Sequence, residues 1–368
     1  GLFAALSVLV VACPCVIGLA TPVALAAGLN KAARNHILIR DTSALEQMRN
    51  VDVVVFDKTG TLTEGHPTVI GWLWAQGQED HYKDVLLAAE STSDHPLAEA
   101  IVTALEGEEQ VIPAHLDGFE NITGKGVRVA YQGAEYWVGS HKLLKDYQAN
   151  LSDILADMLT QYESDGNSIV YFGRENDLLA VIAIKDQLRV TSMEAIRELR
   201  TQDIEICMLT GDGERTASSV AGSLGIMRFV ADAMPDDKED FIHKLQLQGK
   251  TVAMVGDGVN DAQALSCADV SIAMGKGTDT LMDTAMITLR TSDLLLLPKV
   301  FRLSRQTVSL MYRNLFWAFI YNTVGIFVAA GVLYPVYDIL LSPALAGAAM
   351  ALSCVSVALS SLRLSSRF

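Results

Sequence analysis

Three long stretches of the chain contain apolar and small residues without any charged side chain. Residues 1–29, 314–333 and 339–362 hold no Asp, Glu, Lys or Arg. A helix needs about 20 consecutive apolar residues to cross a bilayer. The pattern therefore predicts three transmembrane helices, one within residues 1–34 and two within residues 296–368.

Basic residues flank these stretches unevenly. The turn Tyr334–Asp338, between the last two stretches, has no Lys or Arg. The other flanks carry Lys31, Arg34, Arg40, Arg302, Arg305, Arg313, Arg363 and Arg367. Because basic flanks stay on the cytoplasmic side, we expect an integral protein of the cell membrane whose large middle segment lies in the cytoplasm.

The middle segment alternates short apolar runs with amphipathic, helix-like runs. The apolar runs VDVVVF, DIEICML, KTVAMVG and DVSIAM are each followed by Gly, Asp or Thr. This alternation is typical of an open parallel α/β sheet of the Rossmann-like kind. Residues 71–177 instead show glycine-punctuated strands that look antiparallel. We therefore predict an α+β domain at 71–177, inserted into an α/β domain formed by residues 35–70 and 178–295.

Composition narrows the possible partners. The net charge of −15 provides no basic face for a nucleic-acid backbone, so nucleic acid is an unexpected partner. The 5 cysteines are odd in number and sparse, which favours a reduced setting over a disulfide framework. The chain begins Gly1-Leu2-Phe3 inside an apolar run, so we expect a preceding part.

Asp57 directly follows the strand VDVVVF and opens the run D-K-T-G-T-L-T-E-G. In open α/β sheets the chemistry lies at the carboxyl ends of the strands. A carboxylate placed there can act as a nucleophile and form an aspartyl phosphate. Attack on the γ-phosphate of ATP requires Mg²⁺ and a lysine to offset negative charge.

Other strand ends supply those groups. Asp257 follows KTVAMVG and can hold Mg²⁺ opposite Asp57, while Lys238 can reach the phosphoryl oxygens. Taken singly, a strand-end D-G or T-G is more often only a turn. Several such motifs at successive strand ends favour a site over a series of simple turns. The remaining candidates that can donate to or steady the site are Thr210, Gly211, Asp212, Asn260 and Asp261.

The run at Asp57, with T-G-D and G-D-G-V-N-D, resembles the P-type ATPase subgroup of the haloacid dehalogenase superfamily. The resemblance implies a haloacid-dehalogenase-like phosphorylation domain at 35–70 and 178–295, with Lys58 in the catalytic set. It also implies ATP as the phosphoryl donor and Mg²⁺ on Asp57, Thr59 and Asp257. Many phosphatases of the superfamily have a second Asp, a general acid, where this chain has Thr59; its absence favours a long-lived phosphoenzyme and a pump.

The inserted domain carries two weaker motifs. Glu90 followed by S-T-S-D-H-P resembles the His-Pro motif of heavy-metal pumps, and G-K-G-V with Gly139 resembles their adenine-binding glycines. The resemblance implies a nucleotide-binding domain at 71–177. In isolation, such motifs are more often a turn before a helix or a bend in a strand. The residues implied in nucleotide binding are Glu90, His95, Pro96, Gly124, Gly126 and Gly139.

The first apolar stretch contains A-C-P-C-V, with Cys13 and Cys15 on either side of Pro14. Proline removes a helix hydrogen bond and frees the carbonyl of Val10, so we expect the helix to break there. Two thiolates facing one cavity would select Cu(I) and similar soft ions. The alternative is that both cysteines only pack beside a kink.

Zinc and cadmium pumps share C-P-C, so the later stretches decide the metal. Tyr321-Asn322, and Met350 with Cys354 in M-A-L-S-C-V-S, resemble the copper branch; the zinc branch would show an intramembrane Lys and Asp. Packing alone is the usual role of a Met or Tyr in a membrane helix. Copper pumps usually have Ser where this chain has Cys354. The sequence therefore does not decide whether the chain prefers copper or silver. Copper pumps also commonly have Pro at the position of Gln263.

The full interpretation is ATP-driven export of Cu(I), or of Ag(I), through a phosphoenzyme at Asp57. A metallochaperone is the expected copper donor, and the bilayer is the expected surrounding. No T-G-E triplet occurs in the chain; the actuator domain and first membrane helices of the family are expected upstream, and we expect this part alone not to complete the cycle. Alternatives are a Zn(II)/Cd(II) pump, a non-transporting haloacid-dehalogenase-type phosphohydrolase, and a natural truncated metal-binding product.

Overall fold

The computed structural model describes residues 2–13, 15–75, 79–93, 95–108, 110–149, 153–257, 261–275, 284–337 and 341–366. The chain divides into two compact units. The helical unit comprises Gly1–Asn50, Met286–Arg290 and Leu296–Phe368. The sheet unit comprises Val51–Ala285 and Thr291–Leu295.

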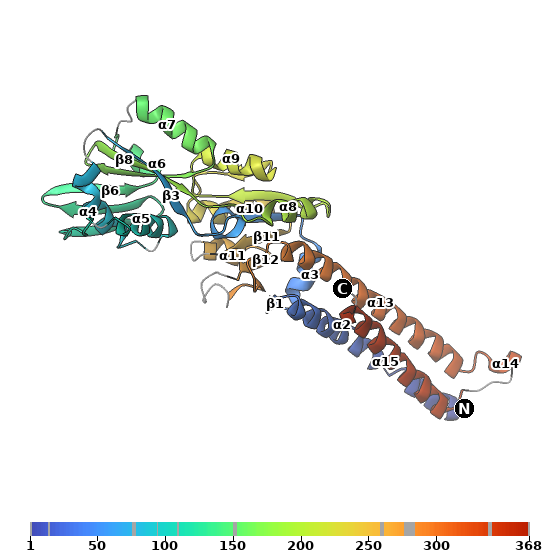
Figure 1. Ribbon diagram of the computed structural model, residues 1–368. Helices are drawn as coiled ribbons and strands as arrows, with labels where there is room; N and C mark the ends of the chain where they lie inside the picture. Colours follow the sequence, from blue (N-terminus) through green and yellow to red (C-terminus); the bar gives the residue numbers. More distant parts are fainter. Residues whose placement is uncertain are drawn as a thin grey trace. The chain divides into compact units, whose positions relative to one another are not determined.

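Helices α2, α13 and α15 run side by side in the helical unit (Figure 1). Small and apolar side chains, including Ala20, Ala318 and Val357, fill the space between them. The described elements of this unit are α1 (Leu2–Val11), α2 (Cys15–Arg34), β1 (Ile37–Ile39), α3 (Ser43–Arg49), β13 (Ile287–Leu289), α13 (Leu296–Ala329), α14 (Tyr334–Tyr337) and α15 (Pro343–Ser366). Strands β1 and β13 pair antiparallel.

The first apolar stretch is interrupted. Helix α1 ends at Val11 and α2 begins at Cys15, on the two sides of the proline at which the sequence predicts a break. Position 14 itself lies outside the described residues. The Cys13 N–H donates to the Val10 carbonyl at 3.4 Å, a three-residue step that tightens the end of α1.

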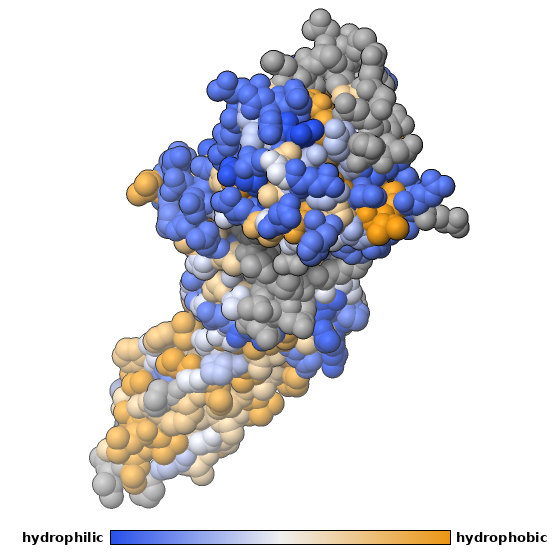
Figure 2. All heavy atoms as spheres, turned by 90° about the vertical axis from the view of Figure 1, so that its left-hand side faces the viewer, coloured by the Kyte–Doolittle hydropathy of each residue, from blue (hydrophilic) through white to orange (hydrophobic). Residues whose placement is uncertain are grey.

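Large apolar side chains cover the outside of these helices. Figure 2 shows hydrophobic residues gathered over the lower part of the view, where the helices lie. Exposed members include Leu9, Leu19, Phe316, Phe319, Phe327, Leu352, Leu359 and Leu362. A soluble protein rarely exposes such a continuous apolar surface, whereas lipid tails would cover it without penalty.

Two helices among the described residues are long and apolar enough to cross a membrane: Ala4–Arg34, with its interruption, and Pro343–Leu364. Helix α13 covers most of the remaining predicted span, yet it ends at Ala329 rather than at residue 333. Membrane crossing by α13 therefore stays a prediction.

The sheet unit contains a parallel sheet with the strand order β12-β11-β2-β9-β10. Its strands are β2 (Val53–Asp57), β9 (Glu205–Leu209), β10 (Arg228–Val230), β11 (Val252–Gly256) and β12 (Val270–Met274). All residues of β2, β11 and β12 are buried, as expected of strands that helices cover on both faces. The predicted haloacid-dehalogenase-like α/β domain is confirmed.

A six-stranded antiparallel sheet is inserted between β2 and β9, with the order β3-β8-β7-β6-β5-β4. The strands are β3 (Thr68–Trp74), β4 (Gly118–Ile122), β5 (Gly126–Tyr131), β6 (Ala134–Gly139), β7 (Ser168–Arg174) and β8 (Asp177–Lys185). Helices α4 (Glu79–Glu90) and α5 (Pro96–Glu106) pack on this sheet through a core that contains Leu86, Ile101 and Phe172. The predicted α+β insertion is confirmed as a fold, but its sheet runs from Thr68 to Lys185, beyond the predicted bounds of 71–177, because β8 pairs with β3 and β7.

The other described helices of the sheet unit are α6 (His141–Asp146), α7 (Asp153–Ser164), α8 (Ser192–Arg200), α9 (Glu214–Leu224), α10 (Pro235–Leu247) and α11 (Ala262–Cys267). Helix α9 follows β9, α10 follows β10, and α11 follows β11. This alternation of strand and helix places the start of each helix beside the carboxyl end of a strand, where the candidate residues lie.

Candidate functional site

Asp57 is the last residue of β2, between β11 and β9 in the parallel sheet. Leu209 of β9 is its partner in register, so Thr210 directly follows at the same edge. Strand β11 ends at Gly256, immediately before Asp257. The structure therefore brings the predicted strand-end residues together at one edge of the sheet.

Three carboxylates gather there. Each of Asp57, Asp257 and Asp261 offers an oxygen, and these oxygens lie within 4.8 Å of one another. The ammonium of Lys238, from the first turn of α10, donates to Asp57 Oδ1 at 2.6 Å and to Asp261 Oδ1 at 2.7 Å. Burial lowers the pKa of Lys238, but the carboxylates of Asp57 and Asp261 outweigh this and leave it above its ordinary value.

The cluster has more negative than positive charge. Burial, then repulsion by Asp57 and Asp261, raises the pKa of Asp257 to about 7. Burial, then repulsion by Asp57, also raises the pKa of Asp261 to about 7. Carboxylate oxygens crowded in this way are the donor set that Mg²⁺ prefers, and a divalent cation would relieve their repulsion. The residues present fit a Mg²⁺ site.

Two residues of the predicted Mg²⁺ set, Asp57 and Asp257, belong to this cluster together with Asp261, which was predicted as a site residue but not as a Mg²⁺ ligand. A Mg²⁺ contact by Thr59, the third residue of the predicted set, stays a prediction. Thr59, two residues after Asp57, has an extended backbone, with φ −72° and ψ 131°. Asn260, another predicted site residue, lies outside the described residues.

Gly60 is required by the geometry of the loop that follows Asp57. Its φ is +69°, and a Cβ at this position would lie 1.4 Å from Asp257 Oδ2. A side chain therefore cannot fit without moving the carboxylate that faces Asp57. The glycine of D-K-T-G keeps this approach open.

Asp186 and Arg189 hold the same loop, and sequence reasoning missed both. Asp186 accepts from the Thr63 hydroxyl at 2.5 Å and from the Gly65 N–H at 3.1 Å. The buried Arg189 guanidinium donates to the carbonyl oxygens of Thr61, at 3.0 Å, and Gly60. Asp186 directly follows β8, a strand of the antiparallel sheet, so the strand-end rule for parallel sheets that identified Asp57 gives no signal for it.

Lys58 is bound to a second group of polar residues. Its ammonium lies 2.5 Å from Asp212 Oδ2 and 3.1 Å from Ser168 Oγ. The Thr210 hydroxyl donates to Asp212 Oδ2 at 2.8 Å, next to Gly211. Burial opposes ionisation of Asp212, but Lys58 more than offsets it and lowers the pKa of the carboxyl. Ser168 begins β7, so this polar group joins the inserted domain to the parallel sheet. The sequence analysis did not predict a role for Ser168.

Glu90 and His95 lie near the junction of α4 and α5. Glu90 ends α4 and is buried, and this burial raises the pKa of its carboxyl to about 7. His95 caps the N-terminus of α5, where Pro96 is the first residue. The Leu97 N–H donates to His95 Nδ1 at 3.2 Å, so a neutral ring carries its proton on Nε2.

The three glycines of the nucleotide motif have close backbone or side-chain neighbours. Gly126 of β5 and Gly139 of β6 are opposite partners in the antiparallel sheet. A Cβ on Gly126 would lie 2.1 Å from the Val138 oxygen, and one on Gly139 would lie 2.2 Å from the Lys125 oxygen. Packing inside the sheet therefore already requires glycine at 126 and 139. A nucleotide contact by these positions, and by Gly124, stays a prediction.

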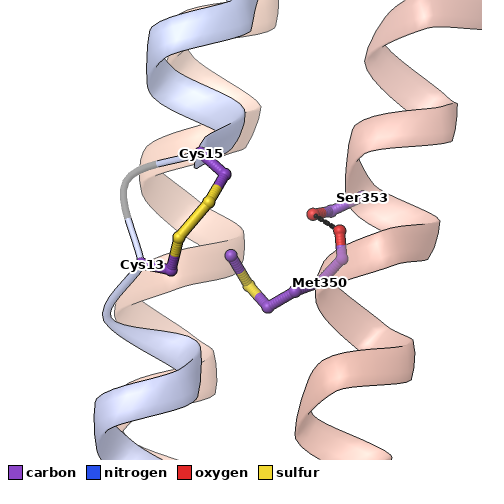
Figure 3. Close-up of a disulfide and its surroundings, with 4 residues drawn as sticks. All are labelled: Cys13, Cys15, Met350 and Ser353. Atoms are coloured by element: carbon purple, nitrogen blue, oxygen red, sulfur yellow. Dashed lines mark hydrogen bonds between the residues drawn. A yellow bond between two sulfur atoms is a disulfide. The ribbon is translucent and has the colours of Figure 1, made fainter.

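The sulfur pair of the first apolar stretch lies at the interruption between α1 and α2. Cys13 and Cys15 form a disulfide, with a Cα–Cα distance of 5.5 Å (Figure 3). The expectation of reduced cysteines is thus wrong for this pair, because two sulfurs two residues apart at the break can meet. Cys207, Cys267 and Cys354 are free.

Met350 extends from α15 toward the two cysteines (Figure 3). It packs against two buried apolar clusters, one that includes Val11, at the end of α1, and one that includes Val16, at the start of α2. Cys354, one turn further along α15, is partly buried against the same helix. The structure therefore places Met350 near Cys13 and Cys15, and Cys354 one turn further along α15.

The two predicted residues of α13 differ from each other. Asn322 is buried, and its Oδ1 has no hydrogen-bond partner among the described residues. Tyr321 is 43% exposed and stacks on Trp317, with 5.7 Å between ring centroids. The geometry of Asn322 fits a polar position inside the helical unit, whereas that of Tyr321 fits the packing alternative.

The family model for haloacid dehalogenase-like hydrolases matches residues 51–269, which include Asp57, Lys238, Asp257 and Asp261. The chain belongs to this hydrolase family. Sequence relatives are metal-exporting P-type ATPases. A copper-exporting P-type ATPase of Legionella pneumophila is 44% identical over 99% of this chain and 49% of its own length. A silver-exporting P-type ATPase of Salmonella typhimurium is 44% identical over 100% of this chain and 44% of its own length.

Solved structures of P-type ATPases also match this chain. A zinc-transporting PIB-type ATPase in its E2.Pi state matches 96% of this chain and 56% of its own, with a TM-score of 0.66 and 34% identity. The catalytic domain of the CPx-ATPase CopB-B matches 74% of this chain and 97% of its own, with a TM-score of 0.62 and 28% identity. The resemblance to heavy-metal P-type ATPases is confirmed. The chain spans about half the length of the curated relatives it matches.

Proposed function

We propose that this chain is the phosphorylated, nucleotide-binding and metal-guiding part of a P-type ATPase that exports Cu(I) at the expense of ATP. The observation that carries the proposal is the cluster of Asp57, Asp257 and Asp261 around Lys238 at the edge of the parallel sheet. The copper- and silver-exporting relatives support the proposal that Cu(I) is the transported ion.

Asp57 is the proposed nucleophile. One of its carboxylate oxygens forms a bond to the γ-phosphorus of ATP, the bond from that phosphorus to the β,γ-bridging oxygen breaks, and ADP leaves. No proton has to be removed from the attacking carboxylate. Lys238 offsets the negative charge that gathers on Asp57 and on the transferred group. A bound Mg²⁺ would supply further charge neutralisation there, held by Asp57 and Asp257 with Asp261 beside them.

Several groups of this chain keep the nucleophile in place. Arg189 and Asp186 bind the backbone of the loop after Asp57, and Lys58 is held by Asp212 and Ser168. Glu90 and His95 are the proposed adenine contacts. Thr59, in the position of a phosphatase general acid, cannot donate a proton as a carboxylic acid does, and this favours a phosphoenzyme that persists.

The sulfur residues are the proposed copper path. The reduced form of Cys13 and Cys15 would offer two thiolates beside the thioether of Met350, a soft donor set that selects Cu(I) or Ag(I). Cys354 adds a further thiol, and Asn322 and Tyr321 complete the predicted set. A singly charged ion balanced by thiolates needs no intramembrane carboxylate, which a Zn(II) path would favour.

The proposed setting follows from the apolar helices and the basic flanks. The helical unit would lie in the cell membrane, with the sheet unit in the cytoplasm, where ATP and a copper metallochaperone are available. An actuator domain and further membrane helices, from the same polypeptide, are the proposed partners for dephosphorylation and for completing the ion path.

The test is ATP-driven metal uptake by membrane vesicles that contain the natural gene product. We expect accumulation of Cu(I), lost when ATP is replaced by a non-hydrolysable analogue. Accumulation of Zn(II) without Cu(I) would favour the Zn(II)/Cd(II) alternative. Steady release of phosphate with no metal movement would favour a phosphohydrolase.

A further inference from the structure

A second group of metal-ligating side chains lies on the sheet unit, outside the carboxylate cluster. Glu239 and His243 are four residues apart on α10 and so share one helix face, and Cys267 is the last residue of α11. Glu239 and Cys267 are half-buried, and His243 is exposed. One ligand atom from each residue lies within 4.8 Å of the others.

Two of the three distances between these atoms match the edges of a tetrahedral site. Glu239 Oε1 lies 3.3 Å from Cys267 Sγ and 3.5 Å from His243 Nε2. Tetrahedral zinc, with bonds of about 2.0–2.3 Å to O, N and S, places its ligand atoms about 3.3–3.6 Å apart. Glu239 thus already has, to Cys267 and to His243, the separations that a bound ion would impose.

The neighbouring Gln246 orients the histidine. Its Oε1 lies 3.2 Å from His243 Nδ1, and its Nε2 donates to the Cys267 carbonyl at 2.9 Å and to Asp269 at 3.3 Å. Because the Gln246 amide nitrogen donates to these two oxygens, the Gln246 amide oxygen faces the histidine and accepts from His243 Nδ1–H. This leaves the lone pair on Nε2, facing Glu239. Metal-binding histidines are held in this way by a partner on the other ring nitrogen.

We propose that Glu239, His243 and Cys267 form a binding site for one Zn²⁺ ion or a similar borderline divalent cation, with solvent in the fourth position. One sulfur, one imidazole nitrogen and one carboxylate oxygen suit zinc better than the hard Mg²⁺. Binding releases the Cys267 proton to solvent, since the thiolate is the ligand.

The site lies on two helices that also carry catalytic groups. Lys238 directly precedes Glu239 on α10, and Asp261 directly precedes α11. A bound ion would fasten α10 to α11 and so hold together the elements that carry Lys238 and Asp261. This inference does not depend on copper export.

The experiment uses the full chain in lipid nanodiscs, with Cys13, Cys15 and Cys354 all replaced by Ser so that Cys267 is the accessible thiol; Cys207 is fully buried. Co²⁺ is the spectroscopic probe. We expect one equivalent of Co²⁺ to produce a thiolate charge-transfer band, and Zn²⁺ to displace it. Cys267→Ser should abolish the band, and His243→Gln should weaken binding about 10–100-fold.

Asp240→Asn, on the same helix, is the matched control and should bind Co²⁺ as the parent does. Melting temperatures without metal establish that each variant is folded, and Zn²⁺ should raise the melting temperature of the parent but not of Cys267→Ser. A parent that shows no band, or a band that persists in both Glu239→Gln and His243→Gln, would overturn the site and leave a hydrogen-bonded surface cluster.

Discussion

The two candidate sites of this chain have opposite chemistry. At the edge of the parallel sheet, Asp57 and its neighbours offer hard oxygen atoms, held by Lys238 and by many hydrogen bonds. In the helical unit, Cys13, Cys15 and Met350 offer soft sulfur atoms among aliphatic side chains. Hard donors suit Mg²⁺, and soft donors suit Cu(I).

Under the proposed function, this difference separates the two substrates, ATP with Mg²⁺ and Cu(I). Among the described residues, the sheet site offers no sulfur donors for Cu(I), and the sulfur site offers no carboxylate oxygens for Mg²⁺. Mg²⁺ should therefore bind only weakly at the sulfur site. The sheet site is fixed by the ion pairs of Lys238 and by hydrogen bonds, whereas the sulfur site depends on a break in a helix. Changes to the first should therefore affect phosphorylation directly, and changes to the second should affect its response to metal.

The largest effect is expected for Asp57→Asn. An amide is not a nucleophile at phosphorus, so labelling from ATP should fall at least about a thousand-fold. The measurement is acid-stable ³²P label on the full-length protein. Asp146→Asn, at an exposed carboxylate of the inserted domain, is the control and should keep the label. Cu(I) binding should survive in both variants; undiminished label in Asp57→Asn would assign the phosphate elsewhere.

Gly60→Ala should come next. The added Cβ would overlap Asp257, 1.4 Å away, and displace a group that faces the nucleophile. A displacement of about 1 Å can reduce a rate about 100-fold, and we expect a loss of that order in the rate of phosphoenzyme formation. Gly222→Ala is the matched control, because a Cβ there meets nothing within 4 Å. Equal rates in the two variants would show that the loop has room the structure does not indicate.

Cys13→Ser and Cys15→Ser should each weaken the sulfur site in the helical unit. Each removes one soft donor, so the Cu(I) concentration that stimulates phosphorylation should rise more than about tenfold, while nucleotide affinity stays unchanged. Ala12→Ser, which adds a hydroxyl beside the pair, should behave as the parent. The disulfide form should also fail to respond until it is reduced. Normal stimulation in both cysteine variants would eliminate the sulfur site.

The smallest effect concerns Glu90, whose pKa burial raises from 4.5 to about 7. The folded state then holds the proton more tightly than the unfolded state, so this residue reduces stability as the pH rises from about 4.5 to about 7, with no further change above. Glu90→Gln should lose that dependence, for a gain of about 1–3 kcal/mol at neutral pH. Thermal unfolding of the two proteins at several pH values measures it; parallel curves would mean that Glu90 ionises normally.

The sequence predicted the parts of the fold that local patterns encode. The apolar runs that become β2, β9 and β11 end where the strands end, so Asp57, Thr210 and Asp257 could be placed at one edge. The C-P-C proline predicted the break between α1 and α2 for an equally local reason, since it removes a hydrogen bond.

Residues joined over long chain separations were harder to predict. Arg189 binds loop carbonyls at Gly60 and Thr61, more than 120 positions away, and Ser168 reaches Lys58 across 110 positions. No local pattern encodes these contacts, because the inserted domain separates the partners. The grouping of Glu239, His243 and Cys267 likewise depends on the packing of α10 on α11.

The most direct test of the two-site account is the metal dependence of the phosphoenzyme on Asp57. The full-length, reduced protein is incubated with labelled ATP and Mg²⁺, and the free concentrations of Cu(I), Ag(I) and Zn(II) are varied separately. The account predicts that Cu(I) and Ag(I) raise the label, that Zn(II) does not, and that a Cys13→Ser/Cys15→Ser variant shows no response. Equal label with Zn(II), or full label without any transition metal, would contradict it.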